Sequence, residues 1–354
     1  MTAFLNVGNT WDEALIDLIA DLNQHGRNVL IDTLYGCTSS NPIGNAREPK
    51  RLQQLSNDQT LSFVGKARKL GMRFAWTINT SCVGNVDKYT EWWKENQGKL
   101  KEYFQFLNPD FLIVAHPLIM ILIRESGIDI PIEISTIADI QEPKQVLALV
   151  DIGINVKRIC LPVHRNRDFK YLESMSAMCK ELGIEVEVIA NEFCFLDQCN
   201  CNGLFRHSCY DMNAHAHEGT AGNNKYPRDL CVMFRERDPA NWLRAKWILP
   251  QHMRLYEDIG INHFKITGRT HPTAFLAKIL PYYMAREFKG NLLELWPHLQ
   301  TINSEKFQDV QKKLVAATSI PTDRLDEFFR HVLHYCTNDC YTCRFCHDFY
   351  TRKL

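Results

Sequence analysis

Cysteine is the residue type whose number and spacing in this chain point most directly to chemistry. The 354 residues include 13 cysteines, most of them in two groups, Cys194–Cys231 and Cys336–Cys346. The N-terminus has neither a basic region nor a long apolar run, so we expect no signal peptide and a cytoplasmic location. Because thiols stay reduced in the cytosol, clustered cysteines there more often bind metal than form disulfides. The two groups are therefore predicted metal sites.

The first group has long and unequal intervals between its cysteines. Six residues separate Cys194 from Cys201, and Cys209 and Cys231 follow at greater distances. Structural zinc sites usually show paired knuckles with two to four intervening residues, which this spacing does not match. Soft thiolate ligands arriving from separate loops suit an iron–sulfur cluster. We predict that these four residues bind metal, and the spacing also allows Cys199 to replace Cys201.

The second group is a compact run near the C-terminus. Its members are Cys336, Cys340, Cys343 and Cys346. Three or four of these thiolates could hold a second 4Fe–4S cluster, which we favour, or a small zinc site. If only three of the thiolates bind, His334 or His347 could be the fourth ligand. The first three cysteines also have radical-SAM spacing, but that motif follows the first strand of its barrel, so this interpretation is not favoured.

Short apolar or β-branched runs alternate with amphipathic segments of helical length along most of the chain. The predicted strands are Phe4–Val7, Val29–Tyr35, Arg73–Ile78, Phe111–Ala115, Ile132–Ile137, Arg158–Pro162, Glu185–Ala190 and His263–Ile266. The predicted helices include Trp11–Gln24, Gln59–Leu70, Lys88–Phe106, Pro143–Val150, Phe169–Leu182 and Trp242–Asp258. Such alternation is typical of parallel α/β folds.

Glycine marks the joint between several predicted helices and the strands that follow. These glycines are Gly71, Gly127, Gly153, Gly183 and Gly260, each placed where a helix takes a left-handed cap. Eight βα units favour an α/β fold of the (β/α)₈ TIM-like barrel type over a doubly wound sheet, because no GxGxxG follows the first strand. We predict a barrel over residues 1–290. Residues 291–354 are predicted to form a small helical, Cys-rich extension, reached through a helix over Pro321–Tyr335.

Polar residues follow many of the predicted strands, at the end of the barrel where active sites lie. The predicted catalytic residues are Asn79, Ser135, His164 and Arg165. The predicted substrate-binding residues are Tyr35, His116, Lys265 and Arg269. We expect Lys265 and Arg269 to bind an anionic group, since Arg suits bidentate carboxylate recognition, although a surface salt bridge is the alternative.

The charge balance limits the classes of partner. Lys and Arg total 41, equal to Asp and Glu, so the net charge is zero. This removes the argument for an overall basic nucleic-acid surface, although a local basic patch is still possible. No apolar run is long enough to span a bilayer, so no membrane span is expected.

Several segments together resemble peptidase family U32. The predicted strand running into Cys194-x₆-Cys201 is similar to the family signature. The other similar segments are Ile132–Thr136, Gly153–Ile159, Arg228–Cys231 and Lys265–Arg269, the last resembling the family's KIEGR. Each motif is weak alone, but together they are specific, and the resemblance covers most of residues 1–290.

The resemblance implies a barrel-like fold and, despite the peptidase name, a 4Fe–4S cluster held by four cysteines. Cys194, Cys201 and Cys231 match family ligands, and Cys209 is the third in chain order. Two departures are His164-Arg165, where the family has Arg-Glu, and Thr267, where KIEGR has Glu. The substrate or the proton chemistry is therefore expected to differ from that of the well-known members.

Characterised relatives in this family include oxygen-independent hydroxylases of ubiquinone synthesis, transfer RNA and ribosomal RNA. The resemblance therefore predicts an iron–sulfur enzyme that performs oxygen-independent hydroxylation, or a related redox reaction, on a small molecule. An RNA hydroxylase is one alternative. A non-catalytic iron–sulfur subunit is another, since quinone-hydroxylating relatives act as heteromeric pairs; a U32-type partner chain or an electron donor is then expected. A peptidase is least favoured, because no local signature assembles a catalytic triad.

Overall fold

Eight parallel strands close into a barrel in chain order. The computed structural model describes residues 2–26, 28–47, 51–195, 226–296, 308–336 and 339–354. The strands are β1 (Ala3–Gly8), β2 (Val29–Gly36), β3 (Arg73–Ile78), β4 (Phe111–Val114), β5 (Ile132–Ile134), β6 (Val156–Cys160), β7 (Glu185–Ile189) and β8 (His263–Ile266). β8 pairs with β1 and closes the barrel. The predicted (β/α)₈ fold is confirmed.

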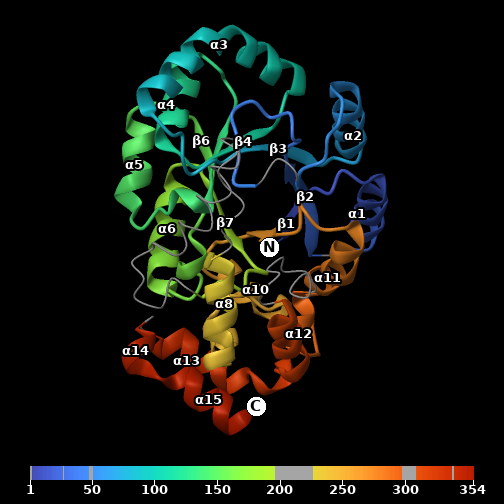
Figure 1. Cartoon of the computed structure of the whole chain (residues 1–354), viewed down its shortest axis with the longest axis vertical. Coiled ribbons are helices and arrows are strands. Elements are labelled where there is room, and N and C mark those ends of the chain that lie inside the picture. The colour runs from blue at the N-terminus through green and yellow to red at the C-terminus, as the bar shows by residue number, and fades with distance from the viewer. Residues whose placement is uncertain (1, 27, 48–50, 196–225, 297–307, 337–338) are drawn as a thin grey trace.

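Helices surround the strands, as Figure 1 shows. Those that follow the first six strands and the last are α1 (Glu13–His25), α2 (Asn57–Lys69), α3 (Val86–Leu107), α4 (Pro117–Glu125), α5 (Pro143–Asp151), α6 (Phe169–Glu181) and α11 (Thr273–Ala285). Between β7 and β8 lie α8 (Tyr226–Arg237), α9 (Asn241–Arg244) and α10 (Met253–Glu257). The C-terminal helices are α12 (Gln308–Ala317), α13 (Asp326–Tyr335), α14 (Cys340–Cys343) and α15 (Phe345–Lys353).

Side-chain caps set several helix starts. The Asp12 carboxylate accepts from the backbone N–H of Ala14, so α1 begins after the predicted Trp11. Ser56 and Gln59 form a capping box at the start of α2, each side chain accepting from the other residue's backbone N–H. Such caps satisfy N–H groups that have no partner within the helix.

The five glycines at the helix-to-strand joints have left-handed backbone conformations. Their φ angles run from +63° at Gly127 to +86° at Gly260. Residues with a Cβ rarely adopt these angles, which is why glycine stands at these joints. The predicted joints are confirmed.

The predicted helix over Trp242–Asp258 is wrong. α9 ends at Arg244, a 3-10 turn covers Pro250–His252, and α10 begins at Met253. Pro250 disfavours helical backbone in the residue before it, and Leu249 is extended with ψ 150°. The segment between the helices is therefore not α-helical, and Ile248 N–H donates to the carbonyl of Ala190, the residue after β7, at 2.8 Å.

Two other predicted boundaries differ. The strand starting at Ile132 ends at Ile134, because the Ser135 hydroxyl accepts from Ile137 N–H and caps a 3-10 turn. The helix expected from Pro321 begins at Asp326, after a 3-10 turn over Thr322–Arg324. Hydroxyl caps and proline account for these shifts.

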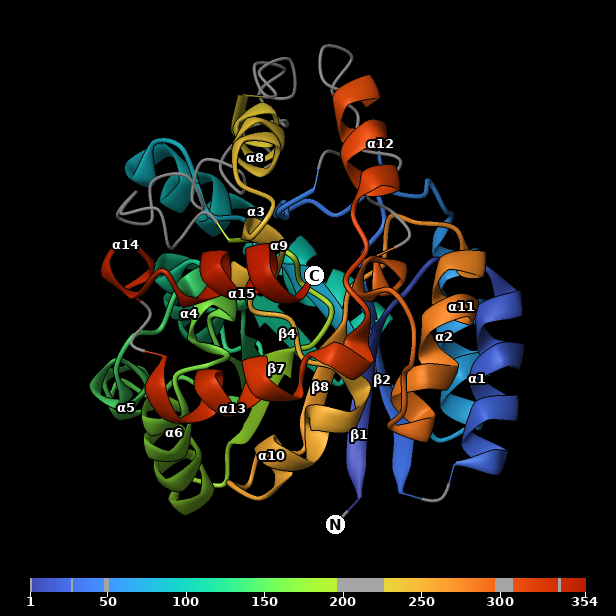
Figure 2. The ribbon, with the colours of Figure 1, turned by 90° about the horizontal axis from the view of Figure 1, so that it is seen from below.

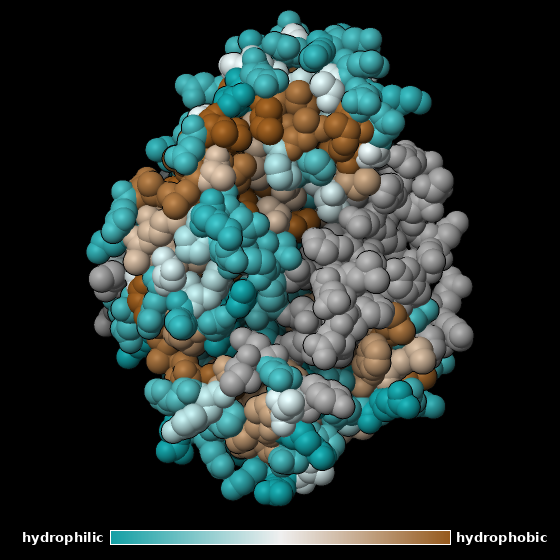
Figure 3. Space-filling view, turned by 90° about the vertical axis from the view of Figure 1, so that its left-hand side faces the viewer, coloured by the Kyte–Doolittle hydropathy of each residue, from teal (hydrophilic) through white to brown (hydrophobic). Residues whose placement is uncertain are grey.

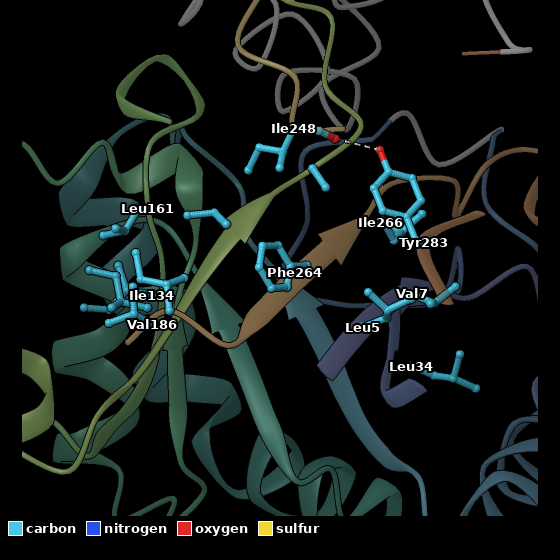
Figure 4. Close-up of a cluster of buried hydrophobic side chains, with 14 of the residues drawn as sticks. Leu5, Val7, Leu34, Ile134, Leu161, Val186, Ile248, Phe264, Ile266 and Tyr283 are labelled. Atoms are coloured by element: carbon cyan, nitrogen blue, oxygen red, sulfur yellow. Dashed lines mark hydrogen bonds between the residues drawn. The ribbon is translucent and has the colours of Figure 1, made fainter. Parts of the chain in front are cut away.

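The main hydrophobic core lies between the barrel and its helices. Leu5, Phe264 and Ile266 are fully buried and belong to strands β1 and β8, as Figure 4 shows. In the same view the Tyr283 hydroxyl of α11 donates to the carbonyl of Ile248 at 3.1 Å. Because strand side chains alternate, Asn6 and Lys265 face the barrel interior.

The C-terminal helices pack against the segment that follows α9. Phe329 of α13 meets the Trp247 ring edge-on at 5.3 Å, and Phe328 stacks on the same ring at 6.1 Å. Figure 1 and Figure 2 show α13 and α15 lying side by side. The division into residues 1–290 and 291–354 stays a prediction.

Some large apolar side chains are exposed on the surface. Figure 3 shows hydrophobic residues gathered in the upper part of one face, at the level of α3 to α5 in Figure 1. Leu147 and Ile152, on and just after α5, are exposed. Within the described residues, no helix has the length and apolar character needed to cross a membrane.

Candidate functional site

A buried ammonium lies between two buried carboxylates inside the barrel. Lys265 of β8 donates to Glu133 Oε1 of β5 at 2.5 Å and to Glu187 Oε2 of β7 at 2.6 Å. The amide of Asn6 on β1 donates to the other oxygen of Glu187. TIM barrels usually fill this space with branched apolar side chains, so the charged layer is a departure that calls for compensating partners.

The three charges fix one another's protonation. Burial and the nearby Glu187 raise the pKa of Glu133, against the lowering effect of Lys265. Burial alone would raise the pKa of Glu187, but Lys265 and Arg158 hold it at about 2. Burial would lower the pKa of Lys265, but the two carboxylates keep it well above its usual value. Lys265 is therefore an ammonium, and Glu133 is the carboxyl in this layer that most readily takes a proton.

A second ion-pair network lies toward the N-terminal end of the barrel. Arg158 of β6 donates to Glu185 at 2.7 Å, and Arg73 of β3 donates to Asp32 and to Glu185 at 3.0 and 3.2 Å. His263 Nε2 lies 3.7 Å from Glu185, and the ring stacks on Phe4. Barrel active sites lie at the opposite, C-terminal end, and residues at this end serve stability, so we assign the network a structural role.

Aromatic and cationic side chains line the opposite, C-terminal end. The Tyr35 ring lies 4.5 Å from Lys265 Nζ, and its hydroxyl donates to the Ile266 carbonyl at 3.2 Å. Arg269 donates to the Thr77 hydroxyl at 2.5 Å. Burial, and the charge of Arg47, lower the pKa of Arg269 to about 10, which still leaves a cation at neutral pH. Arg269 thus places a positive charge at the barrel mouth.

The structure brings two of the predicted catalytic residues together. The Asn79 amide donates to the Ser135 hydroxyl at 3.4 Å, and Asn79 Oδ1 accepts from Ala46 N–H at 3.4 Å. Tyr35, Lys265 and Arg269 form a second predicted set that lies together. Asn79 and Ser135 directly follow β3 and β5, whereas Tyr35 and Lys265 lie near the C-terminal ends of β2 and β8.

Other predicted site residues contact different partners. His116 caps α4, its Nδ1 accepting from Leu118 N–H at 3.2 Å, and burial lowers its pKa. His164 Nε2 lies 3.1 Å from the amide of Gln141, and Arg165 donates to Asp168 at 2.5 Å. His164 and Arg165 thus form a separate cluster on the rim, after β6.

The first cysteine group is described in part. Cys201, Cys209 and the alternative ligand Cys199 lie outside the described residues. Cys194 follows β7, and its N–H donates to the Glu192 carboxylate at 3.1 Å. Cys231 lies on α8, one turn before Arg235, which donates to the Phe193 carbonyl at 2.5 Å. This bond joins α8 to the segment that carries Cys194.

Arg235 is fully buried beside these two cysteines. Burial lowers its pKa, and the thiols of Cys231 and Cys194 act in the opposite direction. Its guanidinium lies 4.1 Å from the Trp242 ring centre. Among the described residues, its Nε and Nη1 groups have no hydrogen-bond acceptor. A buried cation with unmet donors fits an anionic group beside it, near the two thiols.

The four cysteines of the second group line one pocket. Cys336, Cys340, Cys343 and Cys346 share it with Arg167, Arg244 and Lys246. His331, which the sequence did not single out, also lines the pocket, with Nε2 3.9 Å from Cys343 Sγ. Two histidines were proposed as alternative ligands. His347 Nδ1 lies 3.2 Å from Asp238 Oδ1, and His334 packs edge-on against Tyr335. In the described part of the chain, no three His, Cys, Asp or Glu side chains converge as on a single metal ion.

Sequence reasoning missed the charged interior and the buried arginines. The run from Glu185 to Ile189 alternates acidic and apolar residues, which signals that Glu187 faces the opposite side from the valines. Arg235 stands four residues after Cys231, one helical turn, which was also readable. Arg167 and Lys246 had no local signal.

The comparisons with known proteins agree with one another. The family model described as Peptidase family U32 matches residues 41–288. A Methanocaldococcus jannaschii protein named "Uncharacterized protease MJ1657" is 22% identical over 238 residues, 66% of this chain and 66% of the relative, just under two thirds. A solved structure, "The Structure of the U32 Peptidase Mk0906", has a TM-score of 0.51 at 15% identity and covers 76% of this chain and 94% of that chain. At that identity the structural match supports the fold alone.

Proposed function

The chain belongs to peptidase family U32, and from this premise we propose that it is an iron–sulfur enzyme that hydroxylates a small molecule without O₂, or performs a related redox reaction. The observation that carries the proposal is that Cys194 and Cys231 both lie close enough to the buried Arg235 to interact with its charge. Thiolates are the usual ligands of iron–sulfur clusters, and a cation beside them offsets the cluster's negative charge.

In this proposal Cys194, Cys201, Cys209 and Cys231 hold a 4Fe–4S cluster. The cluster supplies one-electron chemistry or a binding point for the oxygen donor. The reaction converts C–H to C–OH, and an oxygen-donor molecule other than O₂ loses its oxygen atom and takes up two electrons. Arg235 keeps the two ends of this ligand set together through its bond to Phe193.

The residues at the mouth bind and orient the substrate. Arg269 offers a cation to an anionic substituent, while Asn79 and Ser135 offer an amide and a hydroxyl. Burial raises the pKa of Tyr35 to about 12, so its phenol stays neutral. The charge of Lys265 is already balanced by two carboxylates, so we assign it the role of positioning Glu133. Glu133, whose pKa is raised, can hold a proton at its carboxylate. The separate rim cluster of His164 and Arg165 would contact a more distant part of the substrate.

Anaerobic purification with iron, sulfide and zinc analysis tests the proposal. We expect a protein containing iron and sulfide in equal amounts, with an EPR signal after reduction. Cys231→Ser should lower the iron content by about four atoms per chain, the content of one cluster. Cys82→Ser is the matched control, since Cys82 lies outside both groups and accepts from Gly84 N–H, as a serine oxygen can. A protein that binds zinc without sulfide would overturn the redox proposal.

Peptide hydrolysis is the alternative that the names of the relatives favour. A casein or collagen digest by the anaerobically purified protein tests it. Cleavage that survives Cys231→Ser would favour a peptidase. RNA hydroxylation would require a basic surface, which salt-dependent RNA binding would reveal.

A further inference from the structure

The C-terminal pocket brings four cysteines to three cations that come from elsewhere in the chain. Arg167 lies between the end of β6 and α6, while Arg244 and Lys246 lie in and just after α9. Arg244 is paired with Asp238 at 2.6 Å. Arg167 and Lys246 are 3% and 2% exposed. The four thiols therefore share this pocket with two deeply buried basic side chains.

Arg167 is held in place by contacts that leave part of its charge unmatched. The Nη1 group of Arg167 donates to the Leu243 carbonyl at 2.7 Å, and its guanidinium lies 4.7 Å from the Trp247 ring centre. Within the described residues, its Nε and Nη2 groups have no acceptor, and it forms no ion pair with a carboxylate. Burying a cation in this way is costly unless an anion lies beside it.

We propose that Cys336, Cys340, Cys343 and Cys346 hold a second 4Fe–4S cluster, whose negative charge is matched by Arg167 and Lys246. Four thiolates on a 4Fe–4S cluster give a dianion in its oxidised state, which supplies an anion for the unmatched charge of Arg167. This site shares no residue with the site of the proposed function, so either can fail alone.

A cluster fits the placement of these thiols better than a single zinc ion does. Zinc draws four sulfurs to about 2.3 Å from one point. The four cysteines line a common pocket, but no three of them, nor any with His331, converge in that way. In a cubane each thiolate binds a different iron, so the sulfurs stand farther apart. In this assignment His331 lies next to Cys343 but is not a ligand of the cluster.

One short helix separates the two cysteine sites. Trp242 of α9 packs under Arg235 of the first site, while Leu243 and Arg244 of the same helix meet Arg167 and the second pocket. The Trp247 indole N–H donates to the Trp242 carbonyl at 2.9 Å and so ties α9 to the segment that follows it. Two reduced clusters on either side of α9 would couple magnetically, and that coupling is measurable without any substrate.

The test is iron, sulfide and zinc analysis of the whole chain, with EPR of the reduced protein. We expect about eight irons in the parent protein, halved in the Cys340→Ser, Cys346→Ser double variant, and unchanged in Cys82→Ser. The coupled EPR signal should become that of one isolated cluster in the double variant and in Cys231→Ser.

Three outcomes would overturn the proposal. About four irons, lost in Cys231→Ser but kept in the C-terminal double variant, would remove the second cluster and leave the proposed function standing. About one zinc that disappears in the double variant would make the pocket a structural zinc site. A parent protein without iron would remove both clusters. Because a parent count well below eight irons already contradicts two clusters in one chain, a variant that fails to fold does not rescue the proposal.

Discussion

Lys265 Nζ lies 2.6 Å from Glu187 Oε2, with both side chains inside the barrel and almost entirely shielded from water. Glu133 lies on the other side of the same ammonium at 2.5 Å. This layer places a lysine between two acids where barrels normally pack apolar side chains. Its stability depends on every charge keeping its partner.

Lys265→Met should destabilise the protein by about 3–5 kcal/mol, because it leaves two carboxylates buried without their cation. Urea denaturation measures the loss. Adding Glu133→Gln to this variant removes one of the unmatched charges and should recover part of the stability. A Lys265→Met protein as stable as the parent would contradict the role assigned to the layer.

Gly8→Ala should displace the backbone of Arg269 and cost about 1–3 kcal/mol. A Cβ at Gly8 would lie 2.6 Å from Arg269 N and 3.0 Å from Gly268 N, which are backbone atoms with little freedom to move. Gly65→Ala on α2 is the matched control, because its Cβ meets no atom within 4 Å. That change should stabilise the helix by about 0.5–1 kcal/mol, so denaturation midpoints should move in opposite directions.

Folding stability should fall as the pH drops from 6.5 toward 4, partly through His263. Burial, and the charge of Arg158, lower the pKa of this imidazole to about 4 in the folded protein. The unfolded chain therefore takes up a proton in this range that the folded chain does not, and stability is lost as the pH falls. The contribution is up to about 1.4 kcal/mol per pH unit. Urea denaturation at several pH values should show a shallower slope for His263→Gln; an unchanged slope would contradict the assignment.

Arg235→Met should lower the reduction potential of the first cluster, on the function proposed above. Removing a buried cation beside Cys194 and Cys231 makes the added electron less stable. Arg235→Lys keeps the charge and should shift the potential less. Arg237→Met on the exposed side of the same helix is the control. Redox titration followed by EPR gives the potentials, and equal values for Arg235→Met and the control would rule out this influence.

Local patterns in the sequence were enough to predict the strands and the glycine joints. The runs Arg73–Ile78 and His263–Ile266 were predicted with their observed bounds, because apolar strand residues and left-handed glycines leave local marks. Pro250 is also a local signal against a continuous helix, but the amphipathic pattern on both sides of it favoured one. A single helix was therefore predicted where the structure has α9, a 3-10 turn and α10.

The sequence by itself determined that this chain alternates strands with helices and gathers its cysteines into two groups, since composition and spacing are properties of neighbouring residues. Tertiary structure decided which charges meet. Barrel closure sets Lys265 against Glu133, 132 positions away, and the packing of α9 brings Arg167 to the C-terminal cysteines. Such contacts depend on how distant segments fold together, so no pattern of neighbours could reveal them.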